Sequence, residues 1–160
     1  MRWVTIAAFA LVVLAACQPA PTEMTEQQAS EVAAQVNAIN DQFWDAWRAA
    51  DIERGVSYYY DSPEFTFAIE GDLLVGFSEV QEVTQSTYAN IASQSITIAE
   101  SHTTVLSPDL VYLVDRGSYA VTDTDGVTGP DTQFVFTALW RNIDGEWKVH
   151  RAHISNPPPQ

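Results

Sequence analysis

Apolar residues follow a helical period in the first part of the chain. Over residues 32–50 they recur every three or four positions, and charged or amide side chains fill the positions between them. Thr25 and Gln28 form a capping-box pattern just before this stretch. The pattern predicts one long amphipathic helix. Asp51 then predicts the cap of a short second helix, which reaches about residue 59 and is interrupted at Gly55.

After residue 61 the period changes to two, which is typical of strands. Apolar and polar residues alternate over residues 65–70, and residues 73–75 can return as a short partner strand. Ser78 and Gln81 form a second capping-box pattern, which predicts a third helix. Further strands are expected over residues 96–106, 110–122, 132–142 and 147–154.

The predicted order is three helices with a small hairpin among them, followed by a long antiparallel meander. The Asp144-Gly145 pair is a strong signal for a tight hairpin between the last two strands. Segregated helices and strands favour an α+β fold over a parallel α/β fold. We therefore expect three N-terminal helices packed on a curved antiparallel sheet, with a cone-shaped interior that can hold a pocket.

The first residues have the features of an export signal. Arg2 precedes an apolar run over residues 3–14, which is too short for a permanent membrane span. Leu14-Ala15-Ala16-Cys17 resembles the lipobox of bacterial lipoproteins, in which the cysteine receives diacylglycerol and becomes the new N-terminus. An ordinary secretory signal, or an uncleaved anchor with an incidental Cys17, is the alternative. Gln18 is not the aspartate that marks inner-membrane retention in enteric bacteria.

These features predict four segments and the cellular location of the domain. The segments are a signal peptide over residues 1–16, a lipidated Cys17 with a flexible tether over residues 17–26, one domain over residues 27–155 and a proline-rich tail over residues 156–160. The domain is expected to be exported and held by its lipid on the periplasmic side of a membrane, the outer membrane rather than the inner.

Charge and cysteine content narrow the class of partner. The chain has 21 Asp and Glu residues against 7 Lys and Arg residues, which gives a formal net charge of −14. Such a surface repels phosphate backbones, so nucleic acid is not an expected partner. Cys17 is the only cysteine, so burial of apolar surface rather than a disulfide must stabilise the domain.

Strand alternation suggests candidate site residues in the last strand. Trp147, Val149, Arg151 and His153 share one face if the strand is regular. Because the first two are apolar, we expect the guanidinium and the imidazole to point into the cone behind them. A buried arginine needs an acid or an anionic ligand. The acids considered as its partners are Asp61, Glu70 and Asp115. The alternative is an internal salt bridge with no ligand.

The C-terminal hairpin carries a family resemblance. Trp140, Asp144-Gly145, Trp147 and the closing His153-Ile154-Ser155 resemble the ending of SnoaL-like domains in the nuclear transport factor 2 superfamily, and the resemblance extends over nearly all of residues 27–155. It implies the cone-shaped nuclear transport factor 2-like fold. Relatives often carry a second histidine at the position of Arg151, so a two-histidine mechanism does not transfer directly.

Three functions are compatible with these residues. The first is a lipid-anchored binding module, which holds a small, partly apolar or anionic ligand in its cone, forms a homodimer through its sheet, or does both. The second is a cofactor-independent enzyme that performs proton transfer, cyclisation or dehydration, with His153, Arg151 and Asp61 as its catalytic residues. The third is a scaffold for an envelope complex. The expected ligand-binding residues are Phe43, Trp47, Tyr60, Phe65, Phe67, Tyr88, Arg151 and His153.

No metal or cofactor is expected. The three histidines are His102, His150 and His153, and the last two face opposite sides of one strand. Asp123-Thr124-Asp125-Gly126 resembles the start of a calcium loop, but no glutamate follows at the required spacing. A hairpin turn explains that segment better.

Overall fold

The computed structural model describes residues 24–157, which form three helices and six strands. The predicted signal peptide, Cys17 and most of the tether lie outside the described residues, as do residues 158–160. Within residues 24–157, no helix is long and apolar enough to cross a membrane.

The first two helices begin where their caps predict. Helix α1 (Glu26–Arg48) begins after Thr25, whose hydroxyl accepts a hydrogen bond from the backbone N–H of Gln28 (3.2 Å), and Gln28 bonds back to the cap (2.9 Å). Helix α2 (Ile52–Ser57) is capped by Asp51. It runs through Gly55 without a break, so the interruption predicted there is wrong. A Cβ at this position would lie 2.9 Å from the indole of Trp47, so the glycine serves close packing instead.

Helix α3 (Phe77–Tyr88) begins differently from its prediction. Its N-cap is Gly76, which has a φ of 94° and no side chain, so the capping box predicted at Ser78 is wrong. The carboxylate of Glu79 accepts from the backbone N–H of Val75 instead (2.8 Å). An acidic side chain in the first turn thus stabilises the start of the helix.

The strands form one six-stranded sheet with the order β2-β1-β6-β5-β4-β3. The strands are β1 (Thr66–Ile69), β2 (Asp72–Val75), β3 (Ile91–Ser107), β4 (Leu110–Asp123), β5 (Thr132–Ile143) and β6 (Glu146–Ser155). The predicted antiparallel meander from β3 to β6 is confirmed. The expectation of a wholly antiparallel sheet is wrong, because β1 pairs with β6 in parallel. This pairing joins the β1–β2 hairpin to the meander.

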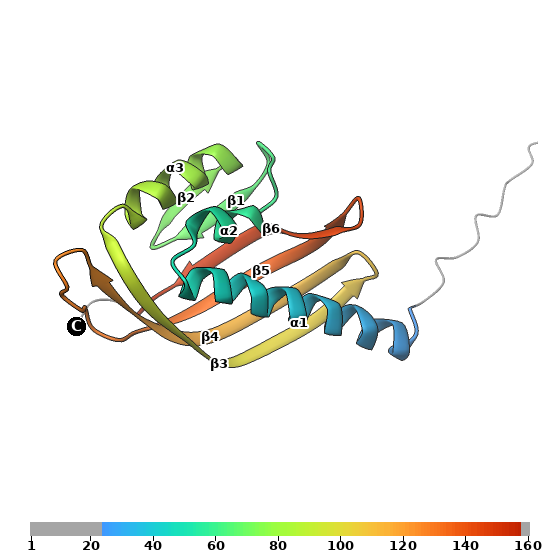
Figure 1. Cartoon of the computed structure of the whole chain (residues 1–160). Coiled ribbons are helices and arrows are strands. Elements are labelled where there is room, and N and C mark those ends of the chain that lie inside the picture. The colour runs from blue at the N-terminus through green and yellow to red at the C-terminus, as the bar shows by residue number, and fades with distance from the viewer. Residues whose placement is uncertain (1–23, 158–160) are drawn as a thin grey trace, which may run out of the picture.

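The helices lie on one side of the curved sheet (Figure 1). Helix α1 lies over β3, β4 and β5, while α2 and α3 lie nearer to β1 and β2. The core between these layers is aromatic: Phe43 of α1 stacks on Phe136 of β5 at 5.5 Å, and Trp140 is fully buried beside it. Large rigid rings fill the interior around Trp140 and leave space at the wide end of the cone, where Phe43 and Phe136 form part of the boundary.

A bulge in β6 changes which side chains face the helices. Trp140 of β5 pairs with Val149, whereas Leu139 pairs with Arg151, so His150 is an extra residue in the strand. Before the bulge Trp147 and Val149 are buried, and after it the buried position is Ala152. Beyond His150 the inward face is therefore the opposite of the one that regular alternation predicts.

Candidate functional site

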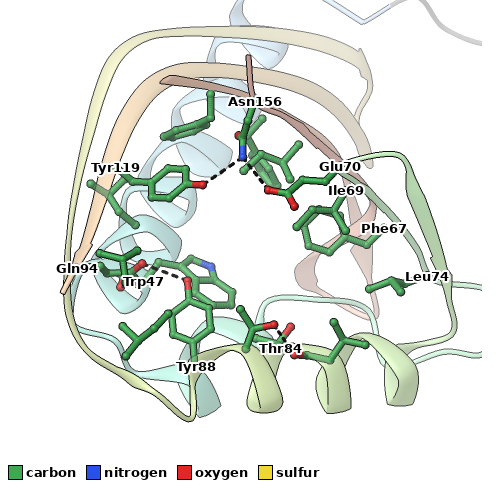
Figure 2. A pocket seen from close by; sticks show the side chains of 18 of the residues that line it. Trp47, Phe67, Ile69, Glu70, Leu74, Thr84, Tyr88, Gln94, Tyr119 and Asn156 are labelled. Carbon is green, nitrogen blue, oxygen red and sulfur yellow. Dashed lines mark hydrogen bonds between the residues drawn. The ribbon is translucent and has the colours of Figure 1, made fainter. Parts of the chain in front are cut away.

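A cavity of about 440 Å³ occupies the wide end of the cone (Figure 2). Its wall combines the second half of α1, the inner side of α3 and inward-facing residues of the sheet. Most of the lining is apolar and aromatic. The rings that line it are those of Phe43, Trp44, Trp47, Tyr59, Phe67, Tyr88, Tyr119, Phe134 and Phe136.

The aromatic wall is held by ring-to-ring contacts. Trp47 packs against Tyr88 with centroids 5.5 Å apart and against Tyr59 at 6.3 Å, and Tyr119 packs against Phe134 at 6.1 Å. These pairs are tilted rather than stacked, an arrangement that the quadrupoles of the rings favour. The wall is thus built from rings of α1, α3, β4 and β5 that contact one another in pairs.

Three polar side chains meet at the open edge of the cavity (Figure 2). The amide nitrogen of Asn156 donates to the carboxylate of Glu70 and to the hydroxyl oxygen of Tyr119, both at 3.1 Å. Because the amide supplies both of these protons, the Tyr119 hydroxyl keeps its own proton for a further acceptor. Burial raises the pKa of Tyr119, and the negative charge of Glu70 adds to the rise, so the phenol is a donor at neutral pH.

The backbone places this cluster. Glu70 and Gly71 have φ values of 51° and 94°, which make the tight turn between β1 and β2 and set the carboxylate at the edge of the cavity. Asn156 directly follows β6, which lies beside β1.

A second polar pair stiffens the opposite wall. The hydroxyl of Tyr88 donates to Gln94 (3.2 Å), whose amide nitrogen donates to the backbone carbonyl of Trp47. Burial raises the pKa of Tyr88, so its hydroxyl stays protonated. These bonds tie α3, β3 and the end of α1 together around the cavity.

Four of the expected ligand-binding residues lie on the cavity wall, and the rest do not. Phe43, Trp47, Phe67 and Tyr88 are part of the lining. Phe65 lies in the solid core with no exposed surface. Tyr60, and with it Asp61, which was expected as a catalytic residue, lines a separate hollow beside Lys148.

The expected orientation of Arg151 and His153 is wrong. His153 is exposed, and neither residue lines the cavity, because the bulge at His150 turns both to the outer face of the sheet. Ile154 takes the inward position instead. The guanidinium of Arg151 donates to Nδ1 of His150 (2.8 Å), and the His150 ring stacks on Tyr60 at 5.2 Å.

The acids considered as partners of Arg151 have other roles. Asp115 is fully buried and accepts from the Asn40 amide (2.9 Å) and from the Trp44 indole (2.6 Å). Glu70 belongs to the cluster at the cavity edge.

The segment that resembles a calcium loop is a turn, in which Asp123 accepts from the backbone N–H groups of Asp125 and Val127.

Sequence reasoning missed Asn156 as a site residue. Asn156 was expected only as the first residue of the proline-rich tail, and Glu70 only as a partner for Arg151. The bulge did leave a signal, since the apolar positions of the last strand are 147, 149, 152 and 154 rather than a single alternating series. That spacing places Ile154, and hence the residues around it, at the cavity.

One family profile covers most of the chain. The profile of the SnoaL-like domain matches residues 36–159. A search of curated protein sequences gives no significant match. Among solved structures, a nuclear transport factor 2-like superfamily protein from Salmonella enterica serovar Typhimurium is similar, with a TM-score of 0.69 and 19% identity over 82% of this chain and 94% of that one.

Two further structures show the same architecture. A ketosteroid isomerase-like protein from Erwinia carotovora atroseptica has a TM-score of 0.67 and 22% identity over 81% of this chain and 98% of that one. A nuclear transport factor 2-like protein of unknown function from Pseudomonas putida has a TM-score of 0.68 and 17% identity over 81% and 89%. At these identities the comparisons establish the fold, and the chemistry has to be argued from the site.

Proposed function

Because the chain belongs to the SnoaL-like domain family, we propose that it binds a small, largely apolar molecule in the cavity at the wide end of its cone. The carrying observation is a cavity of about 440 Å³ with an aromatic wall and the polar cluster of Glu70, Asn156 and Tyr119 at its edge. Ligand sites have this size and this composition, with a few convergent polar groups on an apolar surface.

Filling the cavity tests this proposal. Thr84 of α3 lines the cavity, whereas its neighbour Gln85 is exposed and does not. Thr84→Phe is expected to weaken binding of an apolar fluorescent probe, 1-anilinonaphthalene or a similar aryl amine, by about tenfold or more, and Gln85→Phe to leave it unchanged. Titration of probe fluorescence measures both. Equal probe affinity in the two variants would contradict binding in the cavity.

Proton transfer is the second function that the site supports. Glu70 supplies a carboxylate and Tyr119 a protonated phenol, and both contact the same Asn156 amide. A carboxylate base facing a phenol donor can exchange a proton next to a carbonyl group. The test is deuterium exchange at the α-carbon of 2-tetralone in D₂O, followed by NMR. Acceleration that Glu70→Gln abolishes supports this function, and a rate equal to that of buffer argues against it.

The outer face of the sheet supports self-association. No helix of residues 24–157 covers this face (Figure 1). The strand register places the apolar side chains of Val75, Leu139 and Tyr112 in one row and those of Leu73 and Val114 in the next. Leu73 and Val75 are more than half exposed, at 63% and 53%. A second copy of this chain would cover these side chains in a two-fold dimer.

Lipid attachment at Cys17 completes the proposal. The lipobox-like Leu14-Ala15-Ala16-Cys17 supports it, and the tether would let the domain stand clear of the membrane surface. The full chain expressed in a bacterial host is expected to fractionate with membranes and to incorporate an alkyne-labelled palmitate, and Cys17→Ser to do neither. An unlabelled wild-type chain would contradict lipidation.

A further inference from the structure

We infer that the ligand is an amphipathic organic cation, with an apolar body inside the cone and an amine or quaternary ammonium group beside Glu70 and Asp72. The inference rests on the proposed binding function and names the chemical class of the ligand. It follows from the distribution of charge around the cavity and from the chemistry of its wall.

The charged residues that line the cavity are both acidic. Glu70 and Asp72 lie on the two sides of the β1–β2 turn, and no Lys, Arg or His is among the lining residues of the described chain. The Glu70 carboxylate contacts the neutral amide of Asn156, and no cationic side chain of residues 24–157 lies within 4.0 Å of it. Its charge is therefore solvated at the cavity edge but not neutralised.

Four of the six Lys and Arg side chains of residues 24–157 are engaged elsewhere, and none of the six lines the cavity. Arg48 pairs with Asp45 (2.8 Å), Arg116 with Glu100 (2.9 Å) and Lys148 with Glu146 (3.2 Å). Arg151, which the sequence suggested as an anion contact, lies on the outer face and bonds to His150. An anionic ligand would meet two carboxylates and no counter-charge, in a molecule of net charge −14. The geometry therefore disfavours the anionic ligand expected from Arg151 and His153.

The wall suits a cation with an apolar body. The ring of Tyr119 lies at the cavity edge with Glu70, and Trp47, Tyr88 and Phe67 line the space behind it. Aromatic faces attract ammonium groups, and the attraction grows as water is excluded. An edge carboxylate, a tyrosine ring and an apolar interior together recognise an amine on a hydrocarbon or aryl body better than they recognise an alcohol or an acid.

A matched set of probes tests this inference. 4-Phenylbutylamine, 4-phenylbutan-1-ol and 4-phenylbutanoate share one apolar body and differ in charge. Each is titrated into the protein at pH 7 by calorimetry and by the fluorescence of the tryptophans, two of which line the cavity. We expect the amine to bind about tenfold more tightly than the alcohol, and the acid to bind most weakly.

Variants of the acidic residues test whether the preference for the amine comes from the cavity edge. Glu70→Gln is expected to weaken amine binding about tenfold and to change alcohol binding less than about twofold, because only the charge contact is lost. Asp72→Asn is expected to act in the same direction. Glu82→Gln removes one negative charge from an exposed position of α3 outside the lining, so it controls for net charge and should leave amine binding unchanged.

The outcomes separate this inference from the proposed function. If the alcohol or the acid binds as tightly as the amine, the ligand is not selected for its positive charge and the inference is wrong. The cavity would still be a binding site. Equal loss of amine binding in Glu70→Gln and Glu82→Gln also overturns it, because the effect is then one of net charge. If none of the three probes binds, the inference of a cationic ligand is wrong, and the result also counts against the proposed binding function.

Discussion

Asp115 anchors helix α1 to the sheet from inside the core. One of its oxygens accepts hydrogen bonds from Asn40 and from Trp44, two residues one turn apart on α1. Asn40 is also buried, at 4% exposed surface. Trp44 lines the cavity, so this buried carboxylate helps to set the position of a cavity ring.

Replacing Asp115 should therefore cost stability. Asp115→Ala leaves the buried donors of Asn40 and Trp44 without acceptors, and we expect a loss of about 3 kcal/mol in the free energy of unfolding. Urea denaturation measures it. Asp131→Ala, at an exposed position before β5, is the control and should stay within about 0.5 kcal/mol of the wild type. A loss below about 1 kcal/mol for Asp115→Ala would contradict this role.

His150 lies at the bulge that turns Arg151 outward. A guanidinium can only donate, so the bond from Arg151 requires a neutral His150 with its lone pair on Nδ1. Burial lowers the pKa of His150 below its ordinary value, and the charges of Arg151 and Arg141 lower it further, while Glu64 acts weakly in the opposite direction. The bulge is therefore built around an uncharged imidazole.

The lowered pKa predicts a pH dependence of stability. Below about pH 6.5 the unfolded chain takes up a proton on His150, but the folded chain does so only at its lower pKa. The contribution of neutral His150 to the free energy of unfolding is thus complete above about pH 6.5. It is lost as the pH falls through the pKa of His150 in the folded chain. Urea denaturation between pH 7.5 and pH 5 should show a steeper fall for the wild type than for His150→Gln. His153→Gln, at an exposed position, should behave as the wild type does. Parallel pH profiles for the wild type and His150→Gln would contradict the assignment.

At the scale of elements, Gly117 lets β3 and β4 approach each other. A Cβ at this position would collide with the backbone carbonyl of Thr97 and would lie 3.1 Å from the ring of Phe134. The register of the two strands also shifts nearby, between Ile98 and Glu100. Phe134, which pairs with Gly117 across β4 and β5, lines the cavity, so a side chain at Gly117 would press on a cavity ring.

Gly117→Ala should weaken both the sheet and the site. The backbone of Thr97 cannot move aside as a flexible side chain does, so we expect a loss of about 2 kcal/mol in the free energy of unfolding. Displacement of Phe134 should also weaken binding of the fluorescent probe. Gly129→Ala is the matched control, because its Cβ would lie 3.7 Å from the nearest atom. Equal stability of the two variants, measured in urea, would contradict the steric argument.

Elements with a local signal were predictable from the sequence. The cap at Thr25, the apolar period of α1 and the Asp144-Gly145 turn, where φ is positive at both residues, reflect interactions within a few residues. The parallel pairing of β1 with β6 left no local signal, because α3 and four other strands separate them in the chain. Pairings of this kind are decided by the packing of the whole sheet.

The site was predictable only in its apolar part. Phe43 and Trp47 follow from the helical period of α1, which sets them on its buried face. The polar cluster does not follow from any period, since Asn156 is 86 positions from Glu70 and 37 positions from Tyr119. One extra residue at His150 also moved Arg151 and His153 to the other face of the sheet. A one-residue slip reverses every orientation beyond it.

At the scale of the whole molecule, the acidic and basic residues are distributed unevenly. The acidic excess produces a net charge of −14, which makes two copies repel each other at long range. The outer face of the sheet is the exception. The strand pairing places Arg116 and Arg151 on this outer face, and Arg141 lies there directly opposite Lys148 on the neighbouring strand. The face proposed for self-association thus carries four of the six Lys and Arg residues of residues 24–157, of which Arg116 and Lys148 are paired with Glu100 and Glu146. We expect repulsion between copies to be weaker at this face than over the rest of the acidic surface.

This distribution leads to a prediction about assembly. Leu139 lies in the middle of the outer rows, between Tyr112 and Arg151. Leu139→Asp places a charge and a polar group at the centre of the proposed interface on both copies, where it would be desolvated. We expect residues 24–160 of the wild type to sediment as a dimer at about 100 µM and Leu139→Asp to sediment as a monomer with an unchanged far-ultraviolet circular dichroism spectrum. Val127→Asp adds the same charge at a 64% exposed position in the β4–β5 turn, so it controls for net repulsion and should remain dimeric. If both aspartate variants dissociate alike, net charge rather than the outer face governs assembly, and a monomeric wild type would remove the dimer altogether.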